Sequence, residues 1–152
     1  MKYFTDDKCQ SGEADSEYAA YCRSIWDLLP DSLKEIQDWQ LPDDLCHFDS
    51  KICLHDGKLR NMAHDSRRIT AEIETDFYGA SRRIFLSYGD AVVVQSVDVS
   101  MHNGTATYGD DDIMCTEITV CGDRYQQSLL FASGQELILE FSEFSFRYSD
   151  AS

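Results

Sequence analysis

The chain has 152 residues, a length that fits one domain around a single hydrophobic core. Its 28 acidic residues outnumber the 13 Lys and Arg, so the formal net charge is -15. A field of this sign repels nucleic acids and anionic membranes, because binding to phosphate needs clustered basic side chains. We therefore expect one domain over residues 1–152, with neither nucleic acid nor membrane among its partners.

Helical periodicity is confined to the first part of the chain. Residues 1–12 are expected to form a lead-in with a short apolar element at Tyr3 and Phe4. Across residues 15–29 the apolar side chains recur at intervals of three and four, which predicts an amphipathic helix. Asp15 or Ser16 is expected to cap this helix and Pro30 to end it. A second, shorter helix is expected directly after the proline.

The helical part thus covers about residues 13–40, and from about 51 to 148 the period changes to two, which predicts β-strands. Strands in direct succession favour an antiparallel meander over βαβ units. We expect an α+β fold in which the N-terminal helices pack on an antiparallel β-meander sheet of about six or seven strands. The strand segments are 67–77, 82–88, 91–101, 113–121, 125–132, 135–141 and one through Phe144, Phe146 and Tyr148, with a short strand at 51–54 and a loop at 102–111.

The N-terminus and the cysteines bear on the cellular compartment. Residues 1–8 turn polar at once, and no stretch approaches the ~18 apolar residues of a membrane span. We therefore expect a cytoplasmic protein whose six cysteines remain free thiols. No two cysteines have Cys-x-x-Cys spacing, so neither a zinc ribbon nor a thioredoxin-type site is predicted.

Motifs of catalysis are missing from the sequence. It contains no Gly-x-Ser-x-Gly nucleophile turn, no phosphate-binding loop and no dinucleotide fingerprint. We expect a binding protein rather than an enzyme, with no cofactor and no catalytic residue.

A repeated dipeptide supports an alternative. His55-Asp56 and His64-Asp65 place two imidazoles and two carboxylates within ten residues, and these ligand types suit a transition metal. The alternative is a small metal-binding protein or hydrolase that uses this cluster. The simpler interpretation is that Asp56 and Asp65 form turns and that the histidines stand at strand ends.

Acidic residues are the expected means of recognition. The run at 110–112 lacks the alternating ligands and distal glutamate of a calcium loop, so we interpret it as a solvated acidic loop. The alternative interpretation of the acids on the 67–77 strand is that they form cross-strand ion pairs with the Arg pairs at 67–68 and 82–83, which lie on neighbouring predicted strands. The expected contact residues are Glu72, Glu74, Asp98, Tyr108, Asp110, Asp111 and Asp112, with the tyrosine as an aromatic anchor.

Three stretches of the chain resemble a family of uncharacterised small bacterial proteins that are acidic and cytoplasmic. They are Met1-Lys2-Tyr3-Phe4-Thr5, Leu54-His55-Asp56, and the pattern from Leu129-Leu130-Phe131 to Glu136-Leu137-Ile138-Leu139-Glu140-Phe141-Ser142. The resemblance implies no catalytic residue. In kind, the chain is also similar to the immunity proteins of toxin systems, which bind and block a cognate toxin that is often a basic nuclease.

The leading hypothesis is a cytosolic immunity-type protein that neutralises a basic toxin domain through its acidic surface. Such a surface suits cationic groups that have evolved to hold phosphate. A further alternative is a structural module that assembles with copies of itself through an exposed strand edge.

Overall fold

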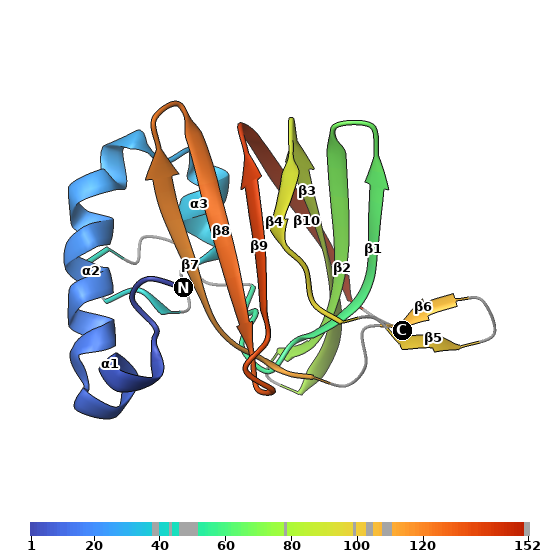
Figure 1. The fold of residues 1–152 in the computed structure, drawn as a ribbon, viewed down its shortest axis with the longest axis horizontal. Helices are drawn as coiled ribbons and strands as arrows, with labels where there is room; N and C mark the ends of the chain where they lie inside the picture. Colours follow the sequence, from blue (N-terminus) through green and yellow to red (C-terminus); the bar gives the residue numbers. More distant parts are fainter. Residues whose placement is uncertain are drawn as a thin grey trace.

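The computed structural model describes residues 1–37, 40–42, 44–45, 52–77, 79–98, 100–102, 105–107 and 111–150, and for residues 77, 100–102 and 105–107 it describes the backbone alone. The helices precede the strands in the chain and lie together on one side of them (Figure 1). They are α1 (Asp6–Ser11), α2 (Glu13–Ile25), the 3-10 turn η1 (Trp26–Leu28) and α3 (Asp31–Ile36).

Eight strands form two four-stranded sheets, and every strand pair in the described residues is antiparallel. The first sheet has the order β1-β2-β3-β10 and the second the order β4-β9-β8-β7, while β5 and β6 form a separate ribbon. The strands are β1 (Lys58–Asp65), β2 (Arg68–Phe77), β3 (Ala80–Gly89), β4 (Val92–Gln95), β5 (Ser100–His102), β6 (Thr105–Thr107), β7 (Ile113–Cys121), β8 (Arg124–Phe131), β9 (Glu136–Phe141) and β10 (Glu143–Asp150).

Two neighbouring strands pass from one sheet into the other at a shared corner. β3 leads into β4 through Asp90, whose φ of 48° lies in the left-handed region that Asp tolerates. β9 leads into β10 through Ser142, whose amide donates to the carbonyl oxygen of Gly89 at 3.1 Å. Arg124 of β8 fastens the corner, because its guanidinium binds the Asp90 carboxylate at 2.8 Å and the Asp90 carbonyl oxygen at 2.6 Å. The two sheets are therefore the halves of one strongly bent sheet.

The outer strands β1 and β7 meet where each of them begins. The amide of Asp56 donates to the carbonyl oxygen of Ile113 at 2.9 Å. The amide of Ile113 in turn donates to the carbonyl oxygen of Gly57, also at 2.9 Å. Lys58 and Asp112 continue this contact as a β-bridge, and their side chains form an ion pair at 2.5 Å. The bent sheet thus closes on itself at this end, and its two halves enclose the core.

Alternating side chains of both halves fill that core. On β2 these are Ile69, Ala71 and Ile73, as the sequence periodicity predicts, and each is at most 2% exposed. A buried polar contact also crosses the core between the halves, since the Tyr88 hydroxyl of β3 donates to Oε1 of Gln127 on β8 at 2.7 Å. Because both groups are buried, this hydrogen bond fixes how the halves sit against each other.

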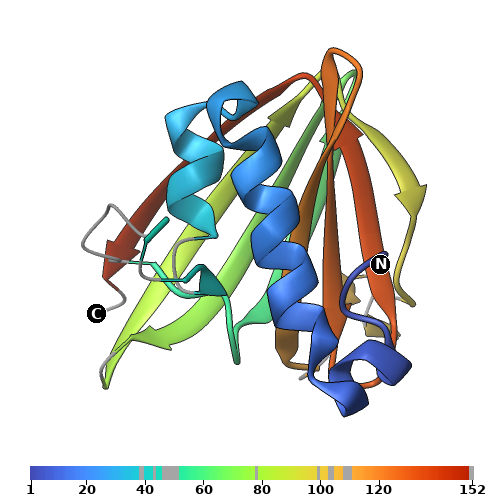
Figure 2. The same cartoon turned by 90° about the vertical axis from the view of Figure 1, so that its left-hand side faces the viewer.

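The helices cover the opening between the sheets on the side where β7 and β10 have free edges (Figure 2). Three side chains bind successive outward-facing amides of β7. The Tyr18 hydroxyl accepts a hydrogen bond from the amide of Ile118 at 2.7 Å, and the Tyr21 hydroxyl accepts one from the amide of Val120 at 2.9 Å. Oε1 of Gln40 accepts a third from the amide of Thr116 at 3.2 Å. On the other edge, the Ser32 hydroxyl donates to the carbonyl oxygen of Phe144 in β10 at 3.1 Å. Side chains therefore take the place of a further strand at both edges.

The two predicted helices are confirmed, whereas the predicted start of the first helix is wrong. α2 and α3 exist on either side of Pro30. α2 begins at Glu13 with Gly12 as its N-cap residue, so the predicted caps Asp15 and Ser16 lie inside the helix. The predicted lead-in contains a further helix, because residues 6–11 form α1.

The α+β class and the antiparallel strands are confirmed, whereas eight of the strands form two hydrogen-bonded sheets joined at a bend, not one meander sheet of six or seven strands. There are two sheets because the chain bends at Asp90 and Ser142, and the helices bridge sheet edges rather than cover one face. The predicted strand 91–101 is interrupted after Gln95, residues 52–54 are not a strand, and the predicted loop contributes β6. The strand β1 was missed because its sequence is polar: it lies at a sheet margin, and its second half is mostly exposed.

Removing the Tyr18 hydroxyl should destabilise the protein more than removing that of Tyr21. Tyr18→Phe leaves both the Ile118 amide and Oε1 of Gln37 without their buried partner, so we expect a loss of about 1–3 kcal/mol in the free energy of unfolding. Tyr21→Phe removes one half-buried hydrogen bond and should cost about 0.5–1 kcal/mol. Urea unfolding of both variants measures the difference, and an equal loss in the two would contradict it.

Candidate functional site

The predicted contact acids of β2 are already occupied within the chain. Glu72 pairs with Arg83 at 3.3 Å, and Glu74 pairs with Arg60 at 3.2 Å. These are cross-strand ion pairs, the alternative use that the sequence indicated for this face. Neither carboxylate is left as a free negative charge for a partner.

The remaining predicted contacts differ in their surroundings. Asp112 pairs with Lys58 at the start of β1, whereas Asp111 accepts hydrogen bonds from the amide and the hydroxyl of Ser133 in the β8–β9 turn. Asp98 is exposed, and its backbone amide donates to Oε1 of Gln135 at 2.6 Å. Tyr108 and Asp110 lie outside the described residues.

Every Lys and Arg in the described part of the chain is engaged internally. Of the 13 in the sequence only Lys51 lies outside it, which leaves twelve. Three of them stack on aromatic rings: Lys2 on Tyr3 and Tyr21, Lys34 on Trp26, and Arg147 on Phe85. The other nine form ion pairs with carboxylates: Lys8, Arg23, Lys58, Arg60, Arg67, Arg68, Arg82, Arg83 and Arg124.

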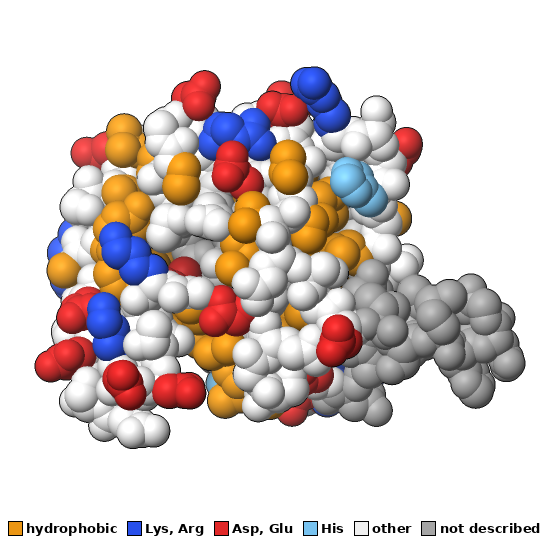
Figure 3. All heavy atoms as spheres, in the orientation of Figure 1, with side chains coloured by type: hydrophobic (Ala, Val, Ile, Leu, Met, Phe, Trp, Pro, Cys, Tyr) orange, Lys and Arg blue, Asp and Glu red, His pale blue; other side chains and the backbone are white. Residues whose placement is uncertain are grey.

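Among the described residues, exposed acids without an ion pair are more numerous on the helices than on the strands and turns. Figure 3 shows acidic side chains gathered at the lower left of the molecule, over α1 and the beginning of α2. Within the described chain, six acids on strands and turns form no ion pair: Asp65, Asp76, Asp98 and Asp123 are exposed, whereas Asp111 accepts hydrogen bonds from Ser133 and Glu117 is buried. The helices carry seven such acids, which we call the helical acids: Asp6, Asp7, Glu13, Asp15, Asp27, Asp31 and Glu35.

The two His-Asp dipeptides are not brought together. His55 and Asp56 precede β1, whereas His64 and Asp65 end it, and the seven steps along that strand span roughly 24 Å. Both ring nitrogens of His55 contact other groups of the chain. Nε2 lies 3.5 Å from the Asp56 carboxylate, and Nδ1 lies 3.0 Å from the carbonyl oxygen of Met114. In the described ranges no group of three or more His, Cys, Asp or Glu side chains is placed to hold a metal ion.

A hollow of about 700 Å³ lies where α1 and α2 meet the end of β8. Its apolar walls include Phe4, Leu130 and Phe131, and its carboxylates are those of Asp6 and Asp15. Both carboxylates belong to the helical acids. The strongest concentration of free negative charge therefore adjoins an apolar hollow.

Three thiols also line the hollow, and all three resist ionisation. Burial raises the pKa of the Cys115 thiol to about 12 and also raises the pKa of Cys53. The pKa of Cys9 is also raised, mainly by burial and then by the nearby carboxylates of Asp15 and Asp6. A thiol with a raised pKa is a poor nucleophile and a poor metal ligand at neutral pH, so these side chains act as neutral walls. The five described cysteines are all free.

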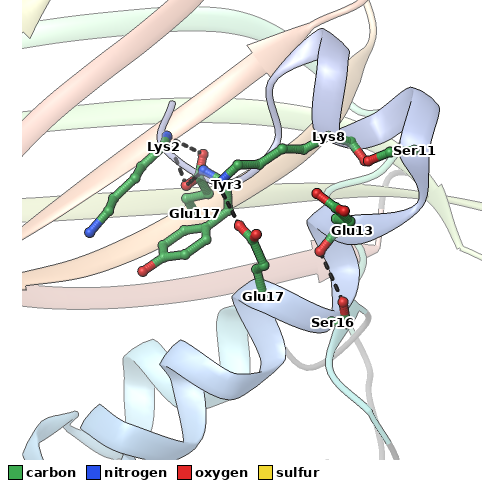
Figure 4. Close-up of polar contacts among 8 residues, drawn as sticks. All are labelled: Lys2, Tyr3, Lys8, Ser11, Glu13, Ser16, Glu17 and Glu117. Atoms are coloured by element: carbon green, nitrogen blue, oxygen red, sulfur yellow. Dashed lines mark hydrogen bonds and ion pairs between the residues drawn. The ribbon is translucent and has the colours of Figure 1, made fainter.

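A buried carboxylate holds the N-terminal segment that forms one wall. Glu117 of β7 is 2% exposed and accepts hydrogen bonds from the amides of Lys2 and Tyr3, the latter at 2.7 Å (Figure 4). An ion pair between Lys8 and Glu17 then joins α1 to α2. These contacts keep Phe4 packed edge-on against Tyr18, with ring centroids 5.3 Å apart.

Of the polar side chains that line this hollow, the sequence singled out His55 alone, as a candidate metal ligand, and missed the carboxylates and thiols. Cys9, Cys53 and Cys115 come from α1, from the segment before β1 and from β7, and no spacing in the sequence connects them. Asp6 and Asp15 carried one usable signal, because acids near the start of a short segment favour the first turn of a helix. That signal predicts a helix and not a shared site.

Comparison of the chain with protein-family models, with curated proteins and with solved structures found no match in any of the three. None of the described helices has the length and apolar character needed to cross a bilayer.

The Cys115 thiol should react very slowly with alkylating reagents. With its pKa raised to about 12, almost none is thiolate at pH 8. We expect iodoacetamide to label it about 100-fold more slowly than free cysteine, with a rate that keeps rising as the pH approaches 10. Peptide mapping by mass spectrometry measures the rate, and the protein unfolded in urea is the control. Labelling within tenfold of free cysteine would show that the thiol is not buried as described.

Proposed function

We propose that this chain is a cytosolic immunity-type protein that binds a basic toxin domain and neutralises it by occupying its cationic surface. In this proposal the chain is no enzyme, and it belongs with the small acidic bacterial proteins that its motifs resemble. The partner would be a protein that holds phosphate groups in its own activity, such as a nuclease.

The observation that carries this proposal is the internal use of all the described basic side chains. Surface ion pairs contribute little to stability, commonly about 0–1 kcal/mol each, but they cancel the field of the bases. Nine of the twelve described bases are paired with carboxylates and the other three lie on aromatic rings, while the chain as a whole carries a net charge of -15. Such a field speeds encounter with a basic partner and disfavours acidic ones.

The helical layer is the face that this argument favours for recognition. Its seven helical acids are free of ion pairs, whereas Glu72 and Glu74 on the sheet are neutralised by arginines. This changes the expected contact set from the strand and loop acids to the helices. Asp98 keeps its place as a peripheral candidate because it is exposed.

Co-expression with the neighbouring reading frame of its source genome tests the proposal. We expect that the neighbouring product alone arrests growth, that this chain restores growth, and that the two proteins co-purify at equal stoichiometry in low salt. The proposal fails if the neighbouring product is harmless, or if growth stays arrested while both proteins are soluble.

Neutralising helical acids should slow association with that partner. We expect Asp7→Asn, Glu13→Gln and Glu35→Gln together to lower the association rate about tenfold at low ionic strength, and much less at high salt. The matched control is Asp65→Asn, Asp76→Asn and Asp123→Asn, which makes the same charge change away from the helices. Stopped-flow measurement at two salt concentrations separates the two sets. Equal slowing in both would mean that only the total charge matters.

A further inference from the structure

The hollow beside α1 is larger than the packing of the helices requires. Pockets that bind small groups commonly enclose roughly 300–1,000 Å³, are mainly apolar and carry a few placed polar groups. The hollow fits this description with about 700 Å³ and a wall of aromatic, aliphatic and thiol side chains. It opens among side chains from both the helical and the strand parts of the chain, so the folded domain forms it as a whole.

The chemistry of the wall selects a positively charged occupant. Asp6 and Asp15 are exposed, and neither forms an ion pair within the described residues. The thiols beside them are neutral because burial raises the pKa of Cys53 and Cys115. No Lys or Arg belongs to the described lining, and its histidine, His55, lies 3.5 Å from the carboxylate of Asp56. The carboxylates of Asp6 and Asp15 therefore favour a cation over an anion.

Phe4 and Phe131 select the second property of the occupant, an apolar body. Both are held in place, since Phe4 packs on Tyr18 and Phe131 joins the core. The amide of Phe131 also donates to the carbonyl oxygen of Gln135 at 2.9 Å, which fixes the turn that carries it. A rigid aromatic wall beside a carboxylate suits a side chain with a long apolar stem and a cationic head.

We infer that this hollow is the docking site for a cationic amphipathic segment of the partner, in which a Lys or Arg reaches Asp6 and Asp15 and a neighbouring apolar side chain packs on Phe4 and Phe131. The inference rests on the proposed function, because it takes the basic partner to be a protein. It assigns the hollow a different task from the other helical acids. They steer the approach of the partner, and the hollow holds it.

Octylguanidinium tests the site without the partner. It combines a guanidinium head with an apolar chain, and 1-octanol and octanoate are the neutral and anionic controls. Titration into the ¹⁵N-labelled protein, followed by amide chemical shifts, should move the signals of residues around Phe4, Cys9, Met114 and Phe131. We expect octylguanidinium to bind at least about tenfold more tightly than either control. Equal binding of octanol, or shifts elsewhere on the protein, would overturn the inference.

A pair of double variants tests the carboxylates. Asp6→Asn with Asp15→Asn should weaken octylguanidinium binding about tenfold. The matched control, Asp27→Asn with Asp31→Asn, makes the same charge change at the other end of the helical layer and should leave the affinity within about twofold. Equal weakening in the two pairs would overturn the site, since it would mean a general field effect.

The same variants distinguish this inference from the proposed function once a partner complex exists. Contacts within an interface act mainly on dissociation, whereas charges at a distance act on association. We expect the Asp6 and Asp15 pair to speed dissociation and the control pair to slow association only. If the complex forms and the first pair leaves dissociation unchanged, the site is wrong and the proposed function stands. If no toxin is neutralised while octylguanidinium binds in the hollow as expected, the proposed function fails instead.

Discussion

The edge of β7 needs hydrogen-bond acceptors, and that need places the helical layer. An unpaired strand edge presents alternate amides outward, and leaving them buried without partners is costly. Here Tyr18, Tyr21 and Gln40 supply the acceptors, each bound to one outward amide. Since the two tyrosines come from α2, this contact sets both the position and the rotation of that helix. The side of α2 that bears Tyr18 and Cys22 is then turned inward, and Glu13 and Asp15 remain on the outside.

The charge pattern of the surface follows from this placement and from the pairing of the strands. Antiparallel ladders bring Arg83 beside Glu72 and Arg60 beside Glu74, and the corner at Asp90 gathers Arg67 and Arg124. The sheets thereby balance much of their own charge. The helices are too short and too acidic for the same balance, because residues 6–36 hold only Lys8, Arg23 and Lys34 against eight acids. A modest excess in composition thus becomes a concentrated negative region on one layer.

Local patterns in the sequence predicted much of the fold but little of the site. Alternation at Ile69, Ala71 and Ile73 identifies β2 because one face of it is buried, and Pro30 separates two helices because it cannot continue one. The division into two sheets depends on Asp90 and Ser142, whose roles are set by long-range pairing. Glu72 pairs with Arg83, as cross-strand pairing predicts, whereas the partner of Glu74 is Arg60 of β1, a strand that the sequence did not predict. The hollow joins residues more than a hundred positions apart.

The helical layer is attached to β7 by side chains and not by a main-chain ladder, and this determines which part of the molecule separates first when it unfolds. A side-chain contact is lost in one step when its helix moves, whereas a strand in a ladder must break a series of bonds. Detachment of α2 would leave the amides of Ile118 and Val120 without their tyrosine acceptors. Such an edge is a template for strands of other molecules, so lesions in the helices should appear as aggregation before they appear as loss of the sheets. The acidic helical layer therefore also protects the edge of β7 from pairing with other copies of the chain.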